Sequence, residues 1–274
     1  MELVSLALYL IITGSIVGFV SGLLGVGGGF IMVPVLLWLL DMTDIDRSIS
    51  TQMVFGTSLA VTAVTAVSGA RTHHRYHKIN LKIVAYLATG SIAGAQLGGF
   101  LAHNTEWEVL RIGFGILMMI IGYLTLTNYE KYCGSGTGIQ NMYLLIPAGF
   151  AVGTISALFG IGGSIISTPI LIFLFCFPIH IAVGISSALI VFTATSGTLS
   201  YIILGQGVHN LPPYSIGYVN AFIWLFLVVT SVVMAQVGAK VTHRIDAQKL
   251  RRIFGVLLII VGLRMFQGYL PVIF

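Results

Sequence analysis

The sequence predicts an all-α polytopic membrane protein built from two inverted repeats, each a glycine-broken helical hairpin followed by three transmembrane helices. Apolar residues make up 57% of the 274 residues and charged residues only 8%, and the mean hydropathy is +1.01. A soluble domain carries roughly a quarter charged residues, so this composition indicates a multi-span membrane protein. A glycine-rich motif also occurs twice, and the segments that follow it recur in the same order, which indicates an internal duplication.

The duplicated motif is SGLLGVGGGFIMVP, from Ser21 to Pro34, which returns as SALFGIGGSIISTP from Ser156 to Pro169. The two copies lie within apolar runs from Leu3 to Leu40 and from Asn141 to Phe175. Each run is far longer than the roughly 20 residues that one spanning helix needs. Because adjacent glycines break helices, we expect two helical arms joined by an unwound turn within the bilayer.

Three spans separated by polar loops follow the first hairpin. They are predicted at Gln52–Ala70, Ile83–Ala102 and Ile112–Thr127. A glycine-rich polar segment, Asn128–Gln140, then joins the two halves. We therefore assign residues 1–132 to the first transmembrane repeat, 133–140 to the linker and 141–274 to the second transmembrane repeat.

The second half repeats the order of the first. GTSLAVTAVTAVSG at Gly56–Gly69 returns as GISSALIVFTATSG at Gly184–Gly197, and later Gln96 returns as Gln236. The duplication thus covers nearly the whole chain.

Two basic loops determine the predicted orientation, Arg71–Lys82 and Lys240–Arg252. Both are cytoplasmic, as the positive-inside rule requires, only if each hairpin counts as an even number of crossings. This arrangement makes the two halves antiparallel and places both termini outside, in a multi-pass protein of the bacterial inner (cell) membrane.

Acidic residues are absent from the interiors of the predicted spans. All eight lie outside them: Glu2, Asp41, Asp44, Asp46, Glu106, Glu108, Glu130 and Asp246. Proton- and sodium-coupled pumps usually carry a carboxylate within the membrane, so this distribution argues against a cation pathway.

Other classes of site and partner are also disfavoured. The basic residues cluster in short loops, where they orient the protein, so we expect no nucleic-acid partner. Cys133 and Cys176 have no metal-ligand spacing and fit structural thiols better than a disulfide framework. We expect no metal site and no cofactor. An enzyme is disfavoured because no catalytic Ser/His, Cys/His or paired-carboxylate arrangement lies within the spans.

The glycine turns predict an anion-binding site. A half-helix that begins at Gly29 or Ser164 directs its unsatisfied N–H groups and its positive dipole end toward the turn. Glycine-interrupted segments at matching places in two halves are typical of a transporter's binding site. For Gly14, Gly18 and Gly22, close helix packing is the preferred interpretation.

The predicted substrate-binding residues come from the two turns and from three glutamines in the spans. They are Ser21, Gly27, Gly28, Gly29, Ser156, Gly162, Gly163, Ser164, Thr168, Gln52, Gln96 and Gln236. The serine and threonine hydroxyls could instead bond to the preceding helical turn, and the glutamines could serve as hydrogen-bonding contacts between helices. The duplicated prolines, Pro34 and Pro169, are predicted structural hinges.

These residues resemble the sulfite exporter TauE/SafE family of bacterial membrane permeases. The duplicated glycine motifs carry the resemblance, together with the basic loop RTHHRYHKINL and the segment LPPYSIGYVN from Leu211 to Asn220. The second turn departs from the pattern, because it reads GIGGS in place of a triple glycine. The resemblance implies transport of sulfur-containing anions or organic sulfonates, generally outward and without ATP hydrolysis.

The sequence therefore predicts a secondary transporter that exports a small sulfur-containing anion, sulfite or an organosulfonate, across the inner membrane. Its expected partners are the small anionic substrate and the lipid bilayer, and a homodimer is compatible with the sequence. Two alternatives stay open. One is a permease for another small anion such as a carboxylate, and the other is a non-transporting membrane assembly factor.

Overall fold

The computed structural model describes residues 3–24, 28–43, 45–76, 80–127, 142–242 and 247–266. The described part of the first half contains α1 (Leu3–Leu24), α2 (Gly29–Leu40), α3 (Arg47–Tyr76), α4 (Leu81–His103) and α5 (Trp107–Leu126). The second half contains η2 (Met142–Leu144), α6 (Leu145–Leu158), α7 (Ser164–Phe173), α8 (Ile179–Leu204), β1 (Ser215–Ile216), β2 (Val219–Asn220), α9 (Ala221–Thr242) and α10 (Ala247–Phe266). The predicted all-α class is confirmed. The linker 133–140 and both chain ends lie outside the described residues.

Both predicted glycine breaks fall between two helices. The first apolar run is divided into α1 and α2, and the second into α6 and α7. The arms α2, α6 and α7 have only 12, 14 and 10 residues, fewer than the roughly 20 that a bilayer requires. Pro34 and Pro169 lie inside α2 and α7, five residues after each helix begins, and their role as hinges stays a prediction.

Helices long and apolar enough to cross a membrane follow each hairpin. Within the described residues there are five such segments: Arg47–Val67, Leu81–His103, Trp107–Leu126, Ile181–Leu204 and Ala221–Gly238. The last predicted span corresponds to α10, a helix of 20 residues that packs along α5. The chain is therefore a multi-pass membrane protein.

Several helices extend beyond the predicted span boundaries. α3 begins at Arg47 and continues to Tyr76, so it includes the start of the segment predicted as a basic loop. α9 likewise continues to Thr242. A helix keeps its own backbone hydrogen bonds beyond the bilayer, so polarity alone does not end it.

Helix packing exchanges partners between the two halves. α1 of the first half packs against α9 of the second, while α6, the repeat counterpart of α1, packs against α4, the counterpart of α9. α3 packs against its own counterpart α8, and α5 against α10. A two-fold relation between repeats would produce this exchange, and the inverted orientation of the repeats stays a prediction.

Glycines allow the closest of these contacts. A Cβ added at Gly14 would meet Thr230, one at Gly18 would meet the Ser231 backbone, and one at Gly22 would meet the Ala235 backbone. All three contacts lie on α9, so the preferred interpretation of this glycine series as a packing surface is confirmed.

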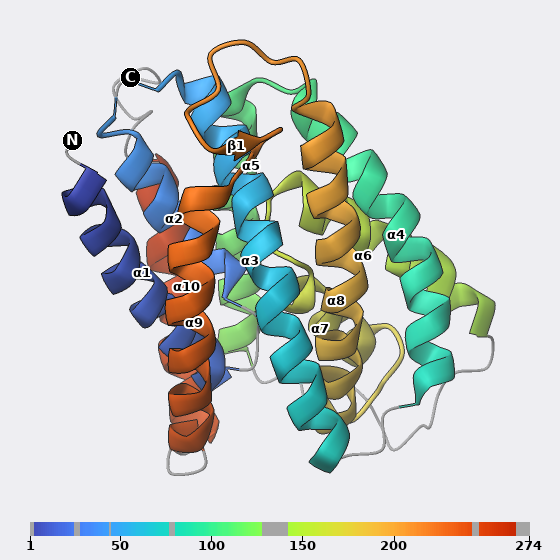
Figure 1. Cartoon of the computed structure of the whole chain (residues 1–274). Coiled ribbons are helices and arrows are strands. Elements are labelled where there is room, and N and C mark those ends of the chain that lie inside the picture. Colours follow the sequence, from blue (N-terminus) through green and yellow to red (C-terminus); the bar gives the residue numbers. More distant parts are fainter. Residues whose placement is uncertain are drawn as a thin grey trace.

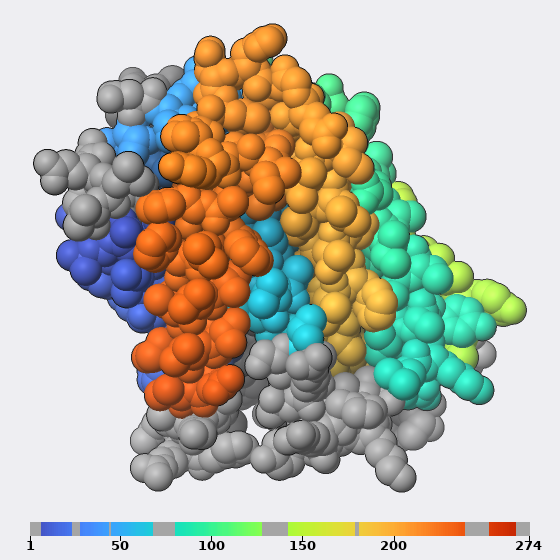
Figure 2. Space-filling model, viewed as in Figure 1, coloured from blue at the N-terminus to red at the C-terminus, as the bar shows by residue number. Residues whose placement is uncertain are grey.

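α3 lies in the middle of the molecule. Figure 1 shows it between a group that includes α1, α9 and α10 and a group that includes α4, α6 and α8. Every residue from 50 to 62 is buried. In Figure 2, α3 is visible only as a narrow strip between α9 and α8. Side chains in the middle of this helix therefore face protein and not lipid.

Candidate functional site

The second glycine turn begins where α6 ends in a Schellman motif. Gly160 adopts a left-handed conformation with φ 68°, and its N–H donates to the carbonyl of Ala157 at 3.3 Å. The N–H of Ile161 reaches back to the carbonyl of Ser156 at 3.0 Å. This pair of bonds satisfies carbonyls at the end of α6, and glycine has no Cβ to oppose the required φ.

Two further left-handed glycines then start α7. Gly162 has φ 85°, and Gly163, the residue before the helix, has φ 107° and ψ −21°. The Gly163 carbonyl accepts the first helical bonds, from Ile166 at 3.2 Å and from Ser167 at 2.9 Å. Having no side chain, Gly163 caps none of the N–H groups in the first turn. The positive end of α7 is thus directed into the protein interior.

The first turn repeats this geometry as far as it is described. Gly28 has φ 77° and ψ −12° and precedes α2, and its carbonyl accepts from Ile31 at 3.2 Å and from Met32 at 3.1 Å. Gly27 lies outside the described residues. α2 therefore also begins at a left-handed glycine that provides no side-chain cap.

The two turns meet inside the protein. A Cβ added at Gly29, the first residue of α2, would lie 2.6 Å from the carbonyl oxygen of Ile161 in the second turn. Gly28, Gly29, Gly162 and Gly163 are all buried. The structure thus brings together the two duplicated segments, which are more than 130 residues apart in the sequence.

Serine hydroxyls lie beside both turns. The Ser156 hydroxyl is 3.0 Å from the position of a Cβ at Gly163, and the Ser21 hydroxyl is 3.2 Å from the equivalent position at Gly28. Ser156 is fully buried, and among the described residues its hydroxyl has no hydrogen-bond partner. A buried hydroxyl without a partner is costly, which suits a donor reserved for a ligand.

The polar residues of α7 are partly engaged within the protein. Thr168 donates to the hydroxyl of Ser186 on α8 at 3.0 Å. Ser164 is 2% exposed at the helix start, and its carbonyl lies 3.5 Å from the hydroxyl of Ser167. The first part of α7, which begins after the second glycine turn, therefore carries three residues with hydroxyl groups: Ser164, Ser167 and Thr168.

Among the described residues, the hydrogen bonds of the predicted glutamines do not involve residues of the glycine turns. Gln96 donates to the carbonyl and to the hydroxyl of Ser196, each at 2.9 Å, so it links α4 to α8. Gln52 donates to the carbonyl of Ala102, while its side-chain oxygen is buried without a partner among the described residues. Gln236 is exposed. The structure thus places Gln96 in the interhelical role, and substrate binding by all three glutamines stays a prediction.

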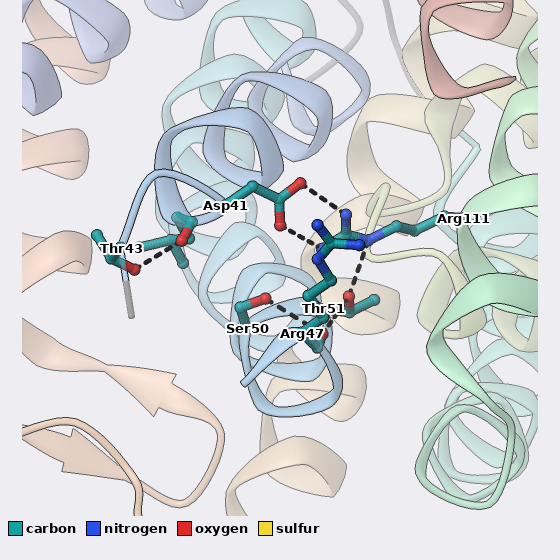
Figure 3. A network of polar contacts seen from close by, with 7 residues as sticks. Asp41, Thr43, Arg47, Ser50, Thr51 and Arg111 are labelled. Carbon is teal, nitrogen blue, oxygen red and sulfur yellow. Dashed lines mark hydrogen bonds and ion pairs between the residues drawn. The ribbon is translucent and has the colours of Figure 1, made fainter. Parts of the chain in front are cut away.

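An ion pair anchors the end of α2 to α3 and α5. Arg111 donates two hydrogen bonds to the Asp41 carboxylate, at 2.7 Å and 2.8 Å, and its Nε donates to the Thr51 hydroxyl at 3.0 Å. Figure 3 shows Arg111 directed at both partners. Arg47 and Arg111 both lie over the ring of Trp107, at 5.3 Å and 5.0 Å. With three hydrogen bonds to two partners, this guanidinium holds the end of α2, α3 and α5 together.

The GYVN segment folds back onto α3. The Asn220 N–H donates to the Thr57 hydroxyl at 3.1 Å, and the Asn220 side chain accepts the N–H of Ile223 at 3.0 Å, which caps the start of α9. The Tyr218 hydroxyl lies 3.0 Å from Nδ1 of His103, and burial raises the pKa of Tyr218. The segment thus closes one end of the central helix.

Metal and thiol chemistry find little support in the described residues. No group of three potential metal-ligating side chains lies together among them. Cys176 is disulfide-bonded, so the expectation of structural thiols is wrong at this position. Its loop is held by a covalent bond as well as by packing.

Comparison with known protein families shows to which family the chain belongs. The sequence model of the sulfite exporter TauE/SafE family matches residues 10–265. The chain belongs to this family. The resemblance of the glycine motifs is therefore confirmed, and the match covers α2 to α9 completely and most of α1 and α10.

Relatives along the whole chain are named as transporters. A probable membrane transporter protein of Methanocaldococcus jannaschii is 30% identical, over 93% of this chain and 94% of the relative. One of Haemophilus influenzae is 28% identical, over 93% of this chain and 96% of the relative, and the Bacillus subtilis protein YunE is 26% identical over 92% and 94%. No solved structure was found to match. The chain is thus a membrane permease of the TauE/SafE type.

Two groups of residues, one at the end of α2 and one on α3, were missed by sequence reasoning. The Arg111–Asp41 pair joins residues 70 positions apart, and each lies in a loop-like polar context that gives no sign of the pairing. Ser58 and Thr62 lie in the middle of α3 and resemble any other small polar residue of a span. Ser58 and Thr62 differ from other small polar residues only in being buried without a hydrogen-bond partner among the described residues. A sequence shows neither property.

Proposed function

We propose that this permease exports a small sulfur-containing anion, sulfite or an organosulfonate, across the bacterial inner membrane. The observation that carries the proposal is the contact in the protein interior between the start of α2, at Gly29, and Ile161 in the turn that leads into α7. Backbone N–H groups and positive dipole ends attract an anion there, and the family is named for sulfite export.

Charge distribution supports an anionic cargo. The described helices carry no Asp or Glu beyond their first turn, so the core offers no carboxylate to relay protons or bind sodium. The buried groups beside the turns are hydroxyls and backbone amides, which donate to oxyanions.

The membrane potential supports the outward direction. An inside-negative potential contributes roughly 2.3 kcal/mol per elementary charge per 100 mV to expelling an anion. A dianion gains about twice that, so export needs no nucleotide hydrolysis.

The burial of the turns supports alternating access. Gly28, Gly29, Gly162 and Gly163 are all closed off from the surface, so the anion reaches them only after the helices around them move. The short arms α2 and α7 are the elements best suited to move, because each follows a glycine that makes no side-chain capping bond.

The arrangement of helix ends supports the proposed orientation. α1 starts and α10 ends at one end of the molecule, marked N and C in Figure 1. α3 and α9 end at the opposite end, and the two basic segments follow them in the sequence. This agrees with a cytoplasmic basic face and with both termini outside.

Flux through purified protein in proteoliposomes tests the proposal. Vesicles would be loaded with sulfite, methanesulfonate, sulfate or acetate, with and without an imposed outside-positive potential. We expect efflux of sulfite or methanesulfonate that rises with the potential. Acetate efflux alone would identify a carboxylate permease, and folded protein without flux of any of these anions would contradict the proposal.

A further inference from the structure

Two buried residues with hydroxyl groups lie on the part of the central helix α3 that packs on the second turn. Ser58 and Thr62 of α3 are both 0% exposed, and among the described residues neither hydroxyl has a hydrogen-bond partner. Thr62 and Gly162 are 100 positions apart in the sequence, yet α3 packs directly on the α6–α7 turn.

Contacts between α3 and the turn fix this placement. A Cβ added at Gly162 would collide with the Thr62 side chain, and one at Gly160 would lie 2.6 Å from the Phe55 backbone. Ser58 lies between Phe55 and Thr62 on the same side of α3, one helical turn before Thr62. Both residues therefore lie on the face of α3 that meets the turn, where the methyl carbon of Thr62 is the atom nearest to a Cβ at Gly162.

Other threonines of α3 and α8 show what the hydroxyl of a threonine ordinarily does within these helices. Thr65, one turn after Thr62, donates to the carbonyls of Val61 at 3.2 Å and Thr62 at 3.1 Å. Thr193 and Thr198 donate to carbonyls four residues earlier, at 3.1 Å and 2.7 Å. This back-bonding is the usual fate of threonine in a buried helix. Thr62 and Ser58 forgo it, at a cost in free energy that folding alone does not explain.

We propose that Thr62 and Ser58 donate hydrogen bonds to the transported oxyanion and form the α3 side of its binding site. With the α7 N-terminus and the Ser156 hydroxyl, donors then converge from three helices: α3, α6 and α7. This inference rests on the proposed anion transport and adds residues from outside the glycine motifs.

The arrangement gives the site a preference among anions. Donors from three directions suit an anion with three oxygens on one centre, such as a sulfonate or sulfite. A carboxylate has two oxygens and leaves at least one buried donor without a partner, which sites of this kind penalise strongly.

An isosteric substitution tests the role of Thr62. Thr62→Val removes the hydroxyl and keeps the methyl group that packs on Gly162. The matched control is Thr65→Val, which removes a hydroxyl that is already bonded. The readouts are the melting temperature of the purified protein and its rise with added methanesulfonate, sulfite or acetate.

A binding role and a structural role give opposite results. We expect Thr62→Val to melt at the same or a higher temperature without anion, because an unsatisfied hydroxyl is gone. We expect its Kd for methanesulfonate to rise about 10-fold or more, the loss of one hydrogen bond to a charged group. Its Kd for acetate should change less, and Thr65→Val should bind methanesulfonate as the wild type does. Ser58→Ala provides a second, independent test with the same expected pattern.

The failures are distinguishable. If the wild type binds a sulfur anion and both Thr62→Val and Ser58→Ala bind it equally well, this inference is wrong and the proposed function stands. If the folded wild type neither binds nor transports any of the anions, both are wrong.

Discussion

After the first glycine turn, α2 carries Met32 and Val33 at the positions where α7, after the second turn, carries Ser167 and Thr168. Met32 and Val33 are buried at 1% and 0% exposure, and they present only apolar atoms. Ser167 is 1% exposed, and Thr168 donates to Ser186 on α8. The two helices thus both begin after a left-handed glycine, Gly28 or Gly163, and differ in the side chains that follow it.

The surroundings of the turns differ in the same direction. The second turn packs on α3 at Gly162 and Thr62 and lies beside the unpartnered hydroxyl of Ser156. At the first turn, Gly29 packs against the backbone of Ile161, and Phe30 packs on Phe254 with ring centroids 5.0 Å apart. The duplication therefore supplies two matching helix starts, each with one serine beside it, and the sequence has placed additional hydroxyl donors at the second. We infer that the second turn holds the anion and the first supports it.

The largest expected effect on anion flux comes from alanine at Gly163 or Gly28, the residues before α7 and α2. Gly163→Ala should reduce anion flux to below about 1% of the wild type, because φ 107° is strained for an L-residue by about 1–3 kcal/mol and the added Cβ crowds Ser156. Gly28→Ala should be milder, since φ 77° is closer to the left-handed helical φ of about 57° that L-residues occasionally adopt. Flux per amount of membrane-inserted protein measures both.

The control for this comparison is the amount of each variant that is inserted into the membrane. Both variants should reach the membrane in amounts close to the wild type, as judged by the monodisperse purified protein. A Gly28→Ala variant more impaired in flux than Gly163→Ala would reverse the assignment of the two turns.

A large loss of stability is expected from the ion pair at the end of α2. Arg111→Ala leaves Asp41 and Thr51 without their partner, and should lower the free energy of unfolding by about 2–4 kcal/mol. The lower part of this range applies, because the Asp41 side chain is 30% exposed. Thermal unfolding of the purified protein measures the effect, with Arg111→Lys as the variant that keeps the charge and loses the paired bonds.

This variant separates stability from recognition. Since the ion pair lies at the end of α2 and not at its start, anion affinity should stay within about 2-fold of the wild type. A selective loss of affinity without a change in melting temperature would place Arg111 in the anion's path.

A smaller effect is expected from the hydroxyl of α7. Thr168→Val removes the bond to Ser186, and should reduce flux by about 3- to 10-fold, the value of a single hydrogen bond of about 1 kcal/mol. The repeat counterpart Val33→Thr should leave flux unchanged. Initial rates of methanesulfonate efflux compare the pair, and equal losses in both variants would contradict the asymmetry between the turns.

The smallest effects are expected at the glutamines. Gln96→Met removes the bonds to Ser196 and should cost about 1 kcal/mol of stability, whereas Gln236→Leu, at an exposed position, should change stability by less than about 0.5 kcal/mol. Neither should alter the Kd for sulfite, which titration calorimetry would show. A higher Kd for sulfite in Gln96→Met than in the wild type would support a role of Gln96 in substrate binding.

Much of the fold could be predicted from the sequence because the relevant signals are local or repeated. Adjacent glycines at Gly27 to Gly29 and at Gly162 to Gly163 mark the breaks between short helices. The four-residue spacing of Gly14, Gly18 and Gly22 marks the surface that packs on α9. Both depend on backbone properties that glycine alone confers.

Long-range partners could not be predicted, because they depend on how the helices pack. Nothing in the sequence around Asp41 indicates Arg111. Nothing in it distinguishes Thr62, whose hydroxyl has no partner in the part of the chain that the structure describes, from Thr65, whose hydroxyl is bonded to its own helix. The substrate role of Gln96 was inferred from polarity in a span, whereas the contact with Ser196 depends on the position of α8. The role of a polar residue in a membrane-spanning helix depends on its hydrogen-bond partners, which residue type alone does not reveal.

The most direct test of the central claim compares the two equivalent serines. The rise in melting temperature with added sulfite or methanesulfonate would be measured for Ser156→Ala and Ser21→Ala. If the second turn holds the anion, Ser156→Ala loses most of the rise and Ser21→Ala keeps it. Equal losses in the two variants, or a larger loss in Ser21→Ala, would contradict the account.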